Sequence, residues 1–197
     1  AGGIVPNGVT MLNKSFRELA SEPTVGKYNK SLAQFLWTSS LTQTQKNLLN
    51  SYKIIVPKSF ENSEYLDYIT TQWQDVLELS CSIEVLPDED FKNRIVAGDY
   101  NMALCEIKGD YNSPDAFLSA FKTNNKNNTF KFSNPQYDNI LNKINTTPKL
   151  SDCITYYSEA EKYLIDNYYY IPAFYQKEYL ISDKKVSGII YDPFTKQ

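Results

Sequence analysis

Three short apolar segments, separated by helical patterns, limit the folds that this chain can adopt. Residues 52–57 read YKIIVP, residues 82–86 read SIEVL and residues 100–105 read YNMALC. Runs of this kind are typical of buried strands. Strands that alternate with helices form βαβ units, because parallel neighbours need a crossover connection. The sequence therefore predicts an α/β fold with a largely parallel sheet flanked by helices.

Helix-start signals predict the elements that cover this sheet and continue the chain beyond it. Helices are expected over 63–79, from Asp88 as N-cap, from Ser113-Pro114, from Asn134-Pro135, and from Thr147-Pro148 to about Asn167. In the first of these, Tyr65 and Trp73 belong to the expected apolar face. The β-rich stretch 168–175, YYYIPAFY, contains a proline, which predicts an edge strand or a crossing segment. Short extended pieces are expected at 179–182 and 186–194.

Composition excludes several classes of partner and chemistry. A formal net charge of -3 and a pI near 5.1 provide no basic field, which argues against nucleic acid or an anionic membrane surface as a partner. The chain has no histidine, which excludes Ser-His and Cys-His catalysis and removes the commonest transition-metal ligand. Neither a cofactor nor a metal ion is therefore expected.

The cysteines give no sign of a zinc site or a complete disulfide framework. Cys81, Cys105 and Cys153 are odd in number and have no CxxC spacing. Cys81 and Cys105 are expected at opposite ends of the sheet, beyond the reach of a disulfide. All three are predicted to be buried or half-buried thiols.

A polar loop between the third expected strand and the helix at Ser113 holds the strongest candidate site. It places Asp110 and Tyr111 at the carboxyl end of a strand, where α/β sheets usually bind ligands. The Asp110 carboxylate could accept hydrogen bonds from a cationic ligand group, or it could bond its own backbone as an Asx turn does. Further along, the asparagine-rich stretch 124–128 is expected to be a mobile, solvent-facing loop.

Other classes of function have weaker support. Asp88 with Asp90, or Asp110 with Asp115, could supply the acid and base of a carboxylate hydrolase, but both pairs lie where helix capping and the helix dipole already explain them. An adhesion module of the cell surface is supported only by the stretch 124–128. Binding is therefore favoured over catalysis, and the chain is not expected to be an enzyme.

An ordered series of motifs extends from about residue 28 to residue 194. The chain reads in turn SYKIIV, QWQDVL, SIEVLPDEDFKNRIVAGDYNMAL, GDYNSPDAFLSAF, NPQYDNIL, YYSEAEKYL, IPAFYQ and VSGIIYDPF. In this order and at these spacings, the series resembles the C-terminal lobe of the oligopeptide-binding proteins that serve ABC importers, the extracellular solute-binding protein family 5. No single motif is diagnostic, and the resemblance depends on the whole series.

The resemblance implies a periplasmic-binding-protein-like lobe, in which a mixed sheet with βαβ units is flanked by helices. Residues 1–27 would be an irregular lead-in from the hinge region, and residues 28–185 would form the ligand-binding lobe. Residues 186–197 would return toward a first lobe that is missing from this chain. The chain is thus expected to be one lobe of a two-lobed protein.

The resemblance also assigns the loop its role. In relatives that take peptides, the acid of the Asp-Tyr motif receives the α-amino group of the peptide, and the matching residue here is Asp110. The expected ligand-binding residues are the six of the loop, namely Ile107, Lys108, Gly109, Asp110, Tyr111 and Asn112. Peptide binders commonly have an aromatic residue where Ile107 stands, and the charges of Glu106 and Lys108 are further departures from the pattern.

The implied function is the capture of extracellular oligopeptides and their delivery to ABC permease subunits. Its expected partners are a peptide ligand, the missing N-terminal lobe and the permease. An extracytoplasmic location is implied, in the periplasm or as a cell-surface lipoprotein whose lipid anchor lies outside this fragment. A family member for a nickel chelate, an opine or an oligosaccharide is the alternative, and a carboxylate-based hydrolase is a distant third.

Overall fold

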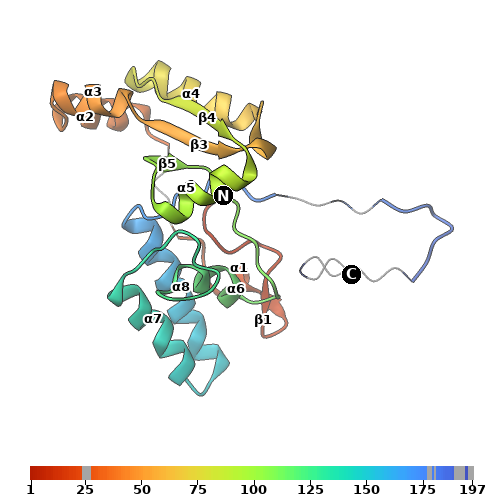
Figure 1. Ribbon diagram of the computed structural model, residues 1–197. Coiled ribbons are helices and arrows are strands. Elements are labelled where there is room, and N and C mark those ends of the chain that lie inside the picture. The colour runs from red at the N-terminus through yellow and green to blue at the C-terminus, as the bar shows by residue number, and fades with distance from the viewer. Residues whose placement is uncertain (24–27, 177–178, 180, 189–193, 195–197) are drawn as a thin grey trace. The chain divides into compact units, whose positions relative to one another are not determined.

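The structure is a computed structural model that describes residues 1–23, 28–176, 179, 181–188 and 194 (Figure 1). The chain divides into two compact units. We call Gly26–Glu106 the inserted unit, and Ala1–Val25 together with Ile107–Gln197 the discontinuous unit, because the first interrupts the second in sequence. Each unit has its own core.

The inserted unit is built on a three-stranded sheet with the order β4-β3-β5. Its strands are β3 (Lys53–Pro57), β4 (Ser82–Leu86) and β5 (Met102–Ala103). Both neighbours of β3 run parallel to it, which confirms the expected parallel sheet. The last strand is shorter than predicted, because its ladder pairing covers only Met102 and Ala103 at the edge of the sheet.

Helices connect these strands, as the βαβ pattern predicts. The short helix η1 (Lys58–Phe60) and α4 (Glu64–Leu77) lie between β3 and β4, and α5 (Asp88–Ala97) lies between β4 and β5. Two further helices, α2 (Lys30–Ser39) and α3 (Gln43–Asn50), precede β3. The side chains of Leu66 and Trp73 on α4 pack with Ile54 and Val56 of β3. Ile95 of α5 is also buried. The sheet core of this unit therefore uses apolar residues from its own helices.

Two sequence expectations about these helices are wrong in detail. Tyr65 is 61% exposed whereas its neighbour Leu66 is 5% exposed, so Leu66 rather than Tyr65 belongs to the buried face. The N-cap of α5 is Pro87, and Asp88 is the first helical residue. Asp88 then stabilises the helix through the dipole of its first turn rather than as a cap.

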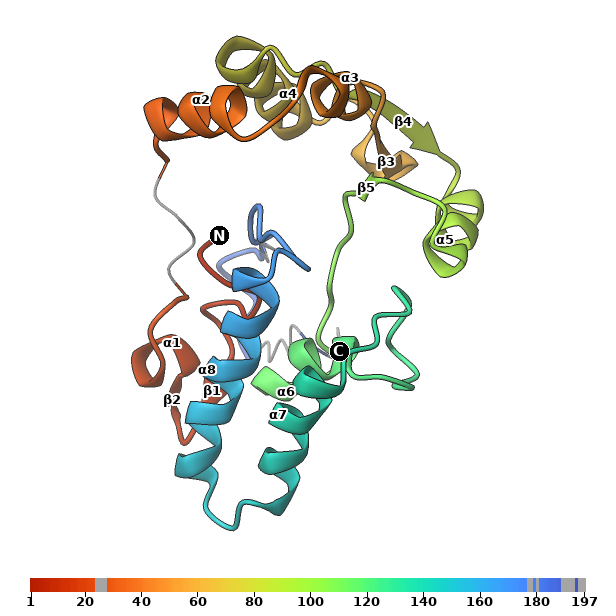
Figure 2. The same cartoon turned by 90° about the vertical axis from the view of Figure 1, so that its left-hand side faces the viewer.

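The discontinuous unit is mainly helical, and Figure 2 shows α7 and α8 lying side by side. Its elements are β1 (Thr10–Met11), β2 (Lys14–Ser15), α1 (Phe16–Leu19), α6 (Pro114–Leu118), η2 (Ser119–Phe121), α7 (Pro135–Thr146) and α8 (Leu150–Asp166). The predicted starts at Ser113-Pro114 and Asn134-Pro135 are confirmed, since Ser113 and Asn134 are side-chain N-caps. The strands β1 and β2 form a small antiparallel ribbon.

The core of this unit joins segments from both ends of the chain. Val5, Val9 and Phe16 are buried in one cluster with Tyr137 and Leu164. The lead-in thus contributes fully buried side chains to a core that α7 and α8 complete. It supplies part of the hydrophobic stabilisation of this unit, because each such side chain leaves water on folding.

A buried ion pair fastens the lead-in to α8. The Glu161 side chain is 1% exposed, and its Oε1 accepts hydrogen bonds from the backbone N–H groups of Ile4 at 2.6 Å and Val5 at 2.8 Å. Its Oε2 accepts from Nη1 of Arg17 at 2.7 Å. The carboxylate is therefore paired and hydrogen-bonded, which a charge needs when it is removed from water.

The remaining expectations concern the chain after α8 and the cysteines. Residues 168–175 contain no strand, so the edge-strand alternative is wrong for that stretch. The extended pieces expected at 179–182 and 186–194 lie partly outside the described residues.

Cys81, Cys105 and Cys153 are free thiols that are half-buried or buried, as predicted. Among the described residues, no helix is long and apolar enough to cross a membrane.

Candidate functional site

The loop that carries Asp110 belongs to the discontinuous unit, whereas the preceding strand belongs to the inserted unit. The loop and the strand that precedes it are therefore packed into different cores. The pairing of β5 stops at Ala103, and by Ile107 the chain packs against the core of the discontinuous unit. The loop is positioned by α6 and its neighbours rather than by the sheet.

Close packing with α6 fixes the loop just before Asp110. A Cβ atom on Gly109 would lie 2.6 Å from ring atoms of Phe117, which is buried on α6. Such a distance is far below van der Waals contact, so only glycine fits here without displacing the ring. Glycine therefore permits the close approach that leads the chain to Asp110.

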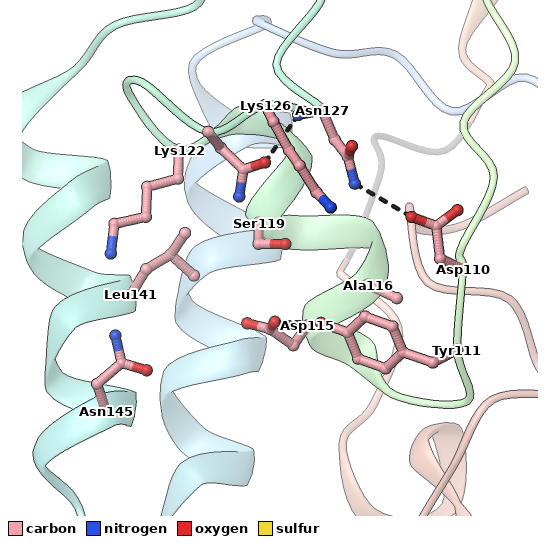
Figure 3. Close-up of a pocket in the computed structure, with 11 residues that line it drawn as sticks. Asp110, Tyr111, Asp115, Ala116, Ser119, Lys122, Lys126, Asn127, Leu141 and Asn145 are labelled. Carbon is pink, nitrogen blue, oxygen red and sulfur yellow. Dashed lines mark hydrogen bonds between the residues drawn. The ribbon is translucent and has the colours of Figure 1, made fainter.

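A pocket of about 490 Å³ lies beside this loop (Figure 3). Its lining is largely polar and comes from the loop, α6, η2, the asparagine-rich stretch and α7: Asp110, Tyr111, Asp115, Ala116, Ser119, Lys122, Asn125, Lys126, Asn127, Leu141 and Asn145. Asp115 lies on α6, whereas Asp110 lies on the loop before it and faces Asn127 (Figure 3). Lys126 belongs to the asparagine-rich stretch, and Lys122 precedes that stretch. The pocket thus offers both a carboxylate and an ammonium to a ligand.

Asp110 is exposed at this pocket, and its carboxylate is already oriented by one partner. Its Oδ2 accepts a hydrogen bond from the side-chain amide of Asn127 at 3.2 Å (Figure 3). This bond comes from a different loop and not from the local backbone of an Asx turn. One carboxylate oxygen therefore remains available to a ligand group.

Tyr111 and Asp115 form the second acidic feature of the pocket. The Tyr111 hydroxyl donates to Oδ2 of Asp115 at 2.6 Å. Burial, together with this hydrogen bond and the charge of Asp115, raises the pKa of Tyr111 well above its usual value. Tyr111 therefore stays protonated at neutral pH and acts as a donor to the carboxylate.

The other loop residues named from the sequence have different positions. The Asn112 side chain is tied to Thr10, since its Oδ1 accepts from the Thr10 backbone N–H at 2.7 Å and its Nδ2 donates to the Thr10 hydroxyl at 2.8 Å. Ile107 packs against the core. Lys108 is exposed, and neither it nor Ile107, Gly109 or Asn112 lines the pocket. The structure brings Asp110 and Tyr111 together at the pocket.

Three residues of the asparagine-rich stretch, Asn125, Lys126 and Asn127, line the pocket and were not selected from the sequence. The sequence predicted only that this stretch is mobile and solvent-facing. Asn124, Lys126 and Asn127 are exposed, as expected, but the next residue, Asn128, is only 8% exposed. Its Nδ2 donates to the carbonyl oxygens of Lys122 at 3.1 Å and Phe132 at 2.6 Å, and its Oδ1 accepts from the Phe132 N–H at 3.1 Å. The run of asparagines could have suggested this, because asparagine side chains readily satisfy backbone groups in loops.

Replacing Asn128 by alanine is expected to lower the free energy of unfolding of the discontinuous unit by about 2–3 kcal/mol, since partly buried backbone groups would lose their partners. Thermal unfolding followed by circular dichroism measures this loss. Asn139→Ala, at an exposed position of α7, is the control and should change stability little. Equal stability of the two variants would contradict the bracing role of Asn128.

The described residues contain no group of three or more His, Cys, Asp or Glu side chains that could hold a metal ion. The pocket lining itself offers hydrogen-bonding groups and charges. Asp110 and Asp115 provide acceptors, whereas Lys122 and Lys126 provide donors. Lys122 is partly engaged, since its Nζ donates to Oδ1 of Asn142 at 2.8 Å.

Comparison with known proteins finds relatives among peptide-binding proteins, although no protein-family model matches the chain. A dipeptide-binding protein of Lactococcus lactis subsp. cremoris is 25% identical over 166 residues, which are 82% of this chain and 30% of that protein. The dipeptide-binding protein DppE of Bacillus subtilis is 22% identical over 180 residues, 91% of this chain and 33% of that protein. The chain therefore spans about a third of the length of these relatives.

Solved structures show the same fold. The murein tripeptide-binding protein MppA of Escherichia coli aligns over 84% of this chain and 32% of its own, with a TM-score of 0.65 and 20% identity. OppA of Haemophilus influenzae, in complex with RPPGFSPFR, aligns over 83% of this chain and 32% of its own, with a TM-score of 0.66 and 19% identity. These likenesses confirm the resemblance drawn from the motif series and the α/β fold expected from it.

Proposed function

Because its relatives are dipeptide- and oligopeptide-binding proteins, we propose that this chain is the C-terminal lobe of a family 5 solute-binding protein that captures peptides for an ABC importer. The observation that carries the proposal is the exposed Asp110 carboxylate, oriented by Asn127 at a polar pocket. A peptide ammonium that leaves water needs such a fixed carboxylate partner. Asp110 is the partner in this proposal.

The rest of the protein would complete the binding site. In this proposal residues 28–185 form the ligand-binding lobe, residues 1–27 lead in from the hinge, and residues 186–197 return toward an N-terminal lobe outside this chain. Closure of the two lobes would bury the peptide, as in hinged binding proteins. The extended peptide would be held chiefly through its backbone, so that its side chains matter less than its amino terminus.

The loop from Ile107 to Asn112 would frame the amino-terminal site. Asp110 would receive the α-amino group, and Tyr111 would line the space beside it. Gly109 lets the loop approach α6, and Asn112 anchors it through Thr10, so these residues would act through loop geometry. Ile107 and Lys108 would flank the site. No bond is made or broken in this function, and the relatives are binding proteins.

Partners and location follow from the same proposal. The peptide would be delivered to ABC permease subunits from an extracytoplasmic location, which the periplasmic proteins among the relatives support. A lipid anchor outside this chain would hold the protein at the cell surface where there is no periplasm.

A non-peptide solute is the second candidate. One relative, 22% identical over 108 residues, is a probable deoxycholate-binding periplasmic protein of Escherichia coli. The aliphatic Ile107 at a position that is commonly aromatic in peptide binders also favours this alternative. The two candidates differ in whether the cargo must carry an ammonium group.

Calorimetric titration of the full-length protein with a random tetrapeptide pool tests the proposal, followed by mass spectrometry of what remains bound. Retained short peptides with free amino termini are the expected result. Retention of a bile acid, a sugar or a metal chelate from matched pools, with no peptide retained, would replace peptide capture by the second candidate.

A further inference from the structure

The asparagine-rich stretch of the discontinuous unit is a closed and braced loop. The Asn128 side chain joins the two ends of the loop. It donates to the carbonyl oxygens of Lys122 and Phe132, and it accepts from the N–H group of Phe132. Phe130 and Phe132 also pack against Phe121 of the core, with ring centroids 5.7 and 6.2 Å away. The loop therefore has a fixed conformation between its two ends.

Within this loop, the backbone of Asn127 is held on both sides. Its N–H donates to Oδ1 of Asn125 at 2.8 Å, and its carbonyl accepts from the Thr129 N–H at 2.9 Å. The direction in which its side chain leaves the backbone is thereby set. That side chain reaches Oδ2 of Asp110 at 3.2 Å (Figure 3).

We propose that Asn127 is a positioning residue for peptide recognition, which holds the Asp110 carboxylate in the orientation that accepts an α-amino group. This inference rests on the proposed function of Asp110. The Asn127 amide donates to Oδ2, which leaves Oδ1 for the ligand ammonium. The asparagine-rich loop then serves the binding site, although it lies apart from the Asp-Tyr motif in sequence.

The physical reason is pre-organisation. An exposed aspartate samples several rotamers, and fixing one of them on binding costs conformational entropy. A hydrogen bond that already selects the rotamer in the free protein removes part of that cost. Because the bond joins two exposed side chains, we expect a moderate effect, roughly three- to tenfold in affinity.

The test compares Asn127→Ala with the wild type in the full-length protein. Two probes are titrated by calorimetry: a random tetrapeptide pool with free amino termini, and the same pool after N-acetylation. The free-amine pool should bind roughly three- to tenfold more weakly to the variant, whereas the acetylated pool should change less than about twofold. In the Asp110→Ala background, Asn127→Ala should cause no further loss.

A merely structural role would give a different pattern. Equal weakening of both pools, or the same loss in the Asp110→Ala background, would overturn the positioning role. Asn127→Leu, which keeps the shape of the side chain without its donor, provides a second variant if alanine disturbs the loop, and it should show the same selectivity loss. Asn139→Ala on the exposed side of α7 is the matched control and should bind like the wild type.

The outcomes also separate this inference from the proposed function. If the wild type favours the free-amine pool and loses that preference with Asp110→Ala, peptide capture through Asp110 stands. An unchanged Asn127→Ala variant in that case would overturn the positioning role alone. If the wild type binds neither pool, the proposed function and the positioning role both fall.

Discussion

Replacing Arg17 by methionine should lower the free energy of unfolding of the discontinuous unit by about 3–5 kcal/mol. The methionine keeps most of the volume of the side chain but leaves Glu161, 1% exposed, without its cationic partner. Without the Arg17 guanidinium, Glu161 would still accept hydrogen bonds from the N–H groups of Ile4 and Val5. A buried carboxylate that has no positive charge beside it lowers the stability of the fold. The lead-in should then separate from α8 before the rest of the unit unfolds.

Hydrogen exchange of α7 and α8 amides, combined with tryptophan fluorescence, measures this effect for each unit separately. The protein has two tryptophans, Trp37 and Trp73, and both belong to the inserted unit. Exchange in α8 should therefore accelerate in Arg17→Met while the tryptophan transition moves less. The control is Lys162→Met, which removes the exposed i,i+4 ion pair between Lys162 and Asp166 on α8. This change should lower the free energy of unfolding by at most about 0.5 kcal/mol. Similar losses in the two variants would contradict a stabilising role for the buried ion pair between Arg17 and Glu161.

The architecture of the inserted unit was predictable because its signals are local. The β4 segment was predicted with its observed bounds, and β3 within one residue, since short apolar runs between helical patterns specify buried strands. Parallel pairing followed from the connections between the strands. The error at Tyr65 has the same origin, because residues 65 and 66 are both apolar neighbours and the pattern did not decide which of them faces the sheet.

The packing of the discontinuous unit was not predictable, because it joins residues far apart in sequence. Arg17 and Glu161 are separated by 144 positions, and a charged residue in an amphipathic helix is normally expected on its solvent face. The lead-in has little periodicity and was therefore described as irregular, although it contributes buried residues to the core. Local patterns carry no information about such long-range partners.

The loop residues selected from the sequence account for only part of the pocket lining. Asp110 and Tyr111 were selected from their loop, and both line the pocket, but the supporting residues come from α6, α7 and the asparagine-rich loop. Asn127 could not be assigned from sequence, because its partner Asp110 lies 17 positions away in another loop that only the fold brings to it. A single sequence therefore selected Asp110 but not the residue that holds its side chain.

In the full-length protein, Asp110→Ala is expected to weaken the binding of peptides with a free amino terminus by roughly 2–5 kcal/mol. The reason is that the closed protein would enclose the peptide ammonium, and truncation would leave that charge without its carboxylate partner. N-acetylated peptides carry no such charge, so the same change should matter much less for them. Calorimetric titration of both forms of one peptide pool measures the difference.

Two further variants make this result specific to the charge of Asp110. Asp110→Asn keeps the size of the side chain and removes its charge, so it should lose most of the same affinity for free-amine peptides. Asp166→Ala removes an exposed carboxylate of α8 that lies outside the pocket, and it should bind both pools like the wild type. Equal losses for free and acetylated peptides in Asp110→Ala would rule out amino-group capture, because the aspartate would then be acting through the shape of the loop.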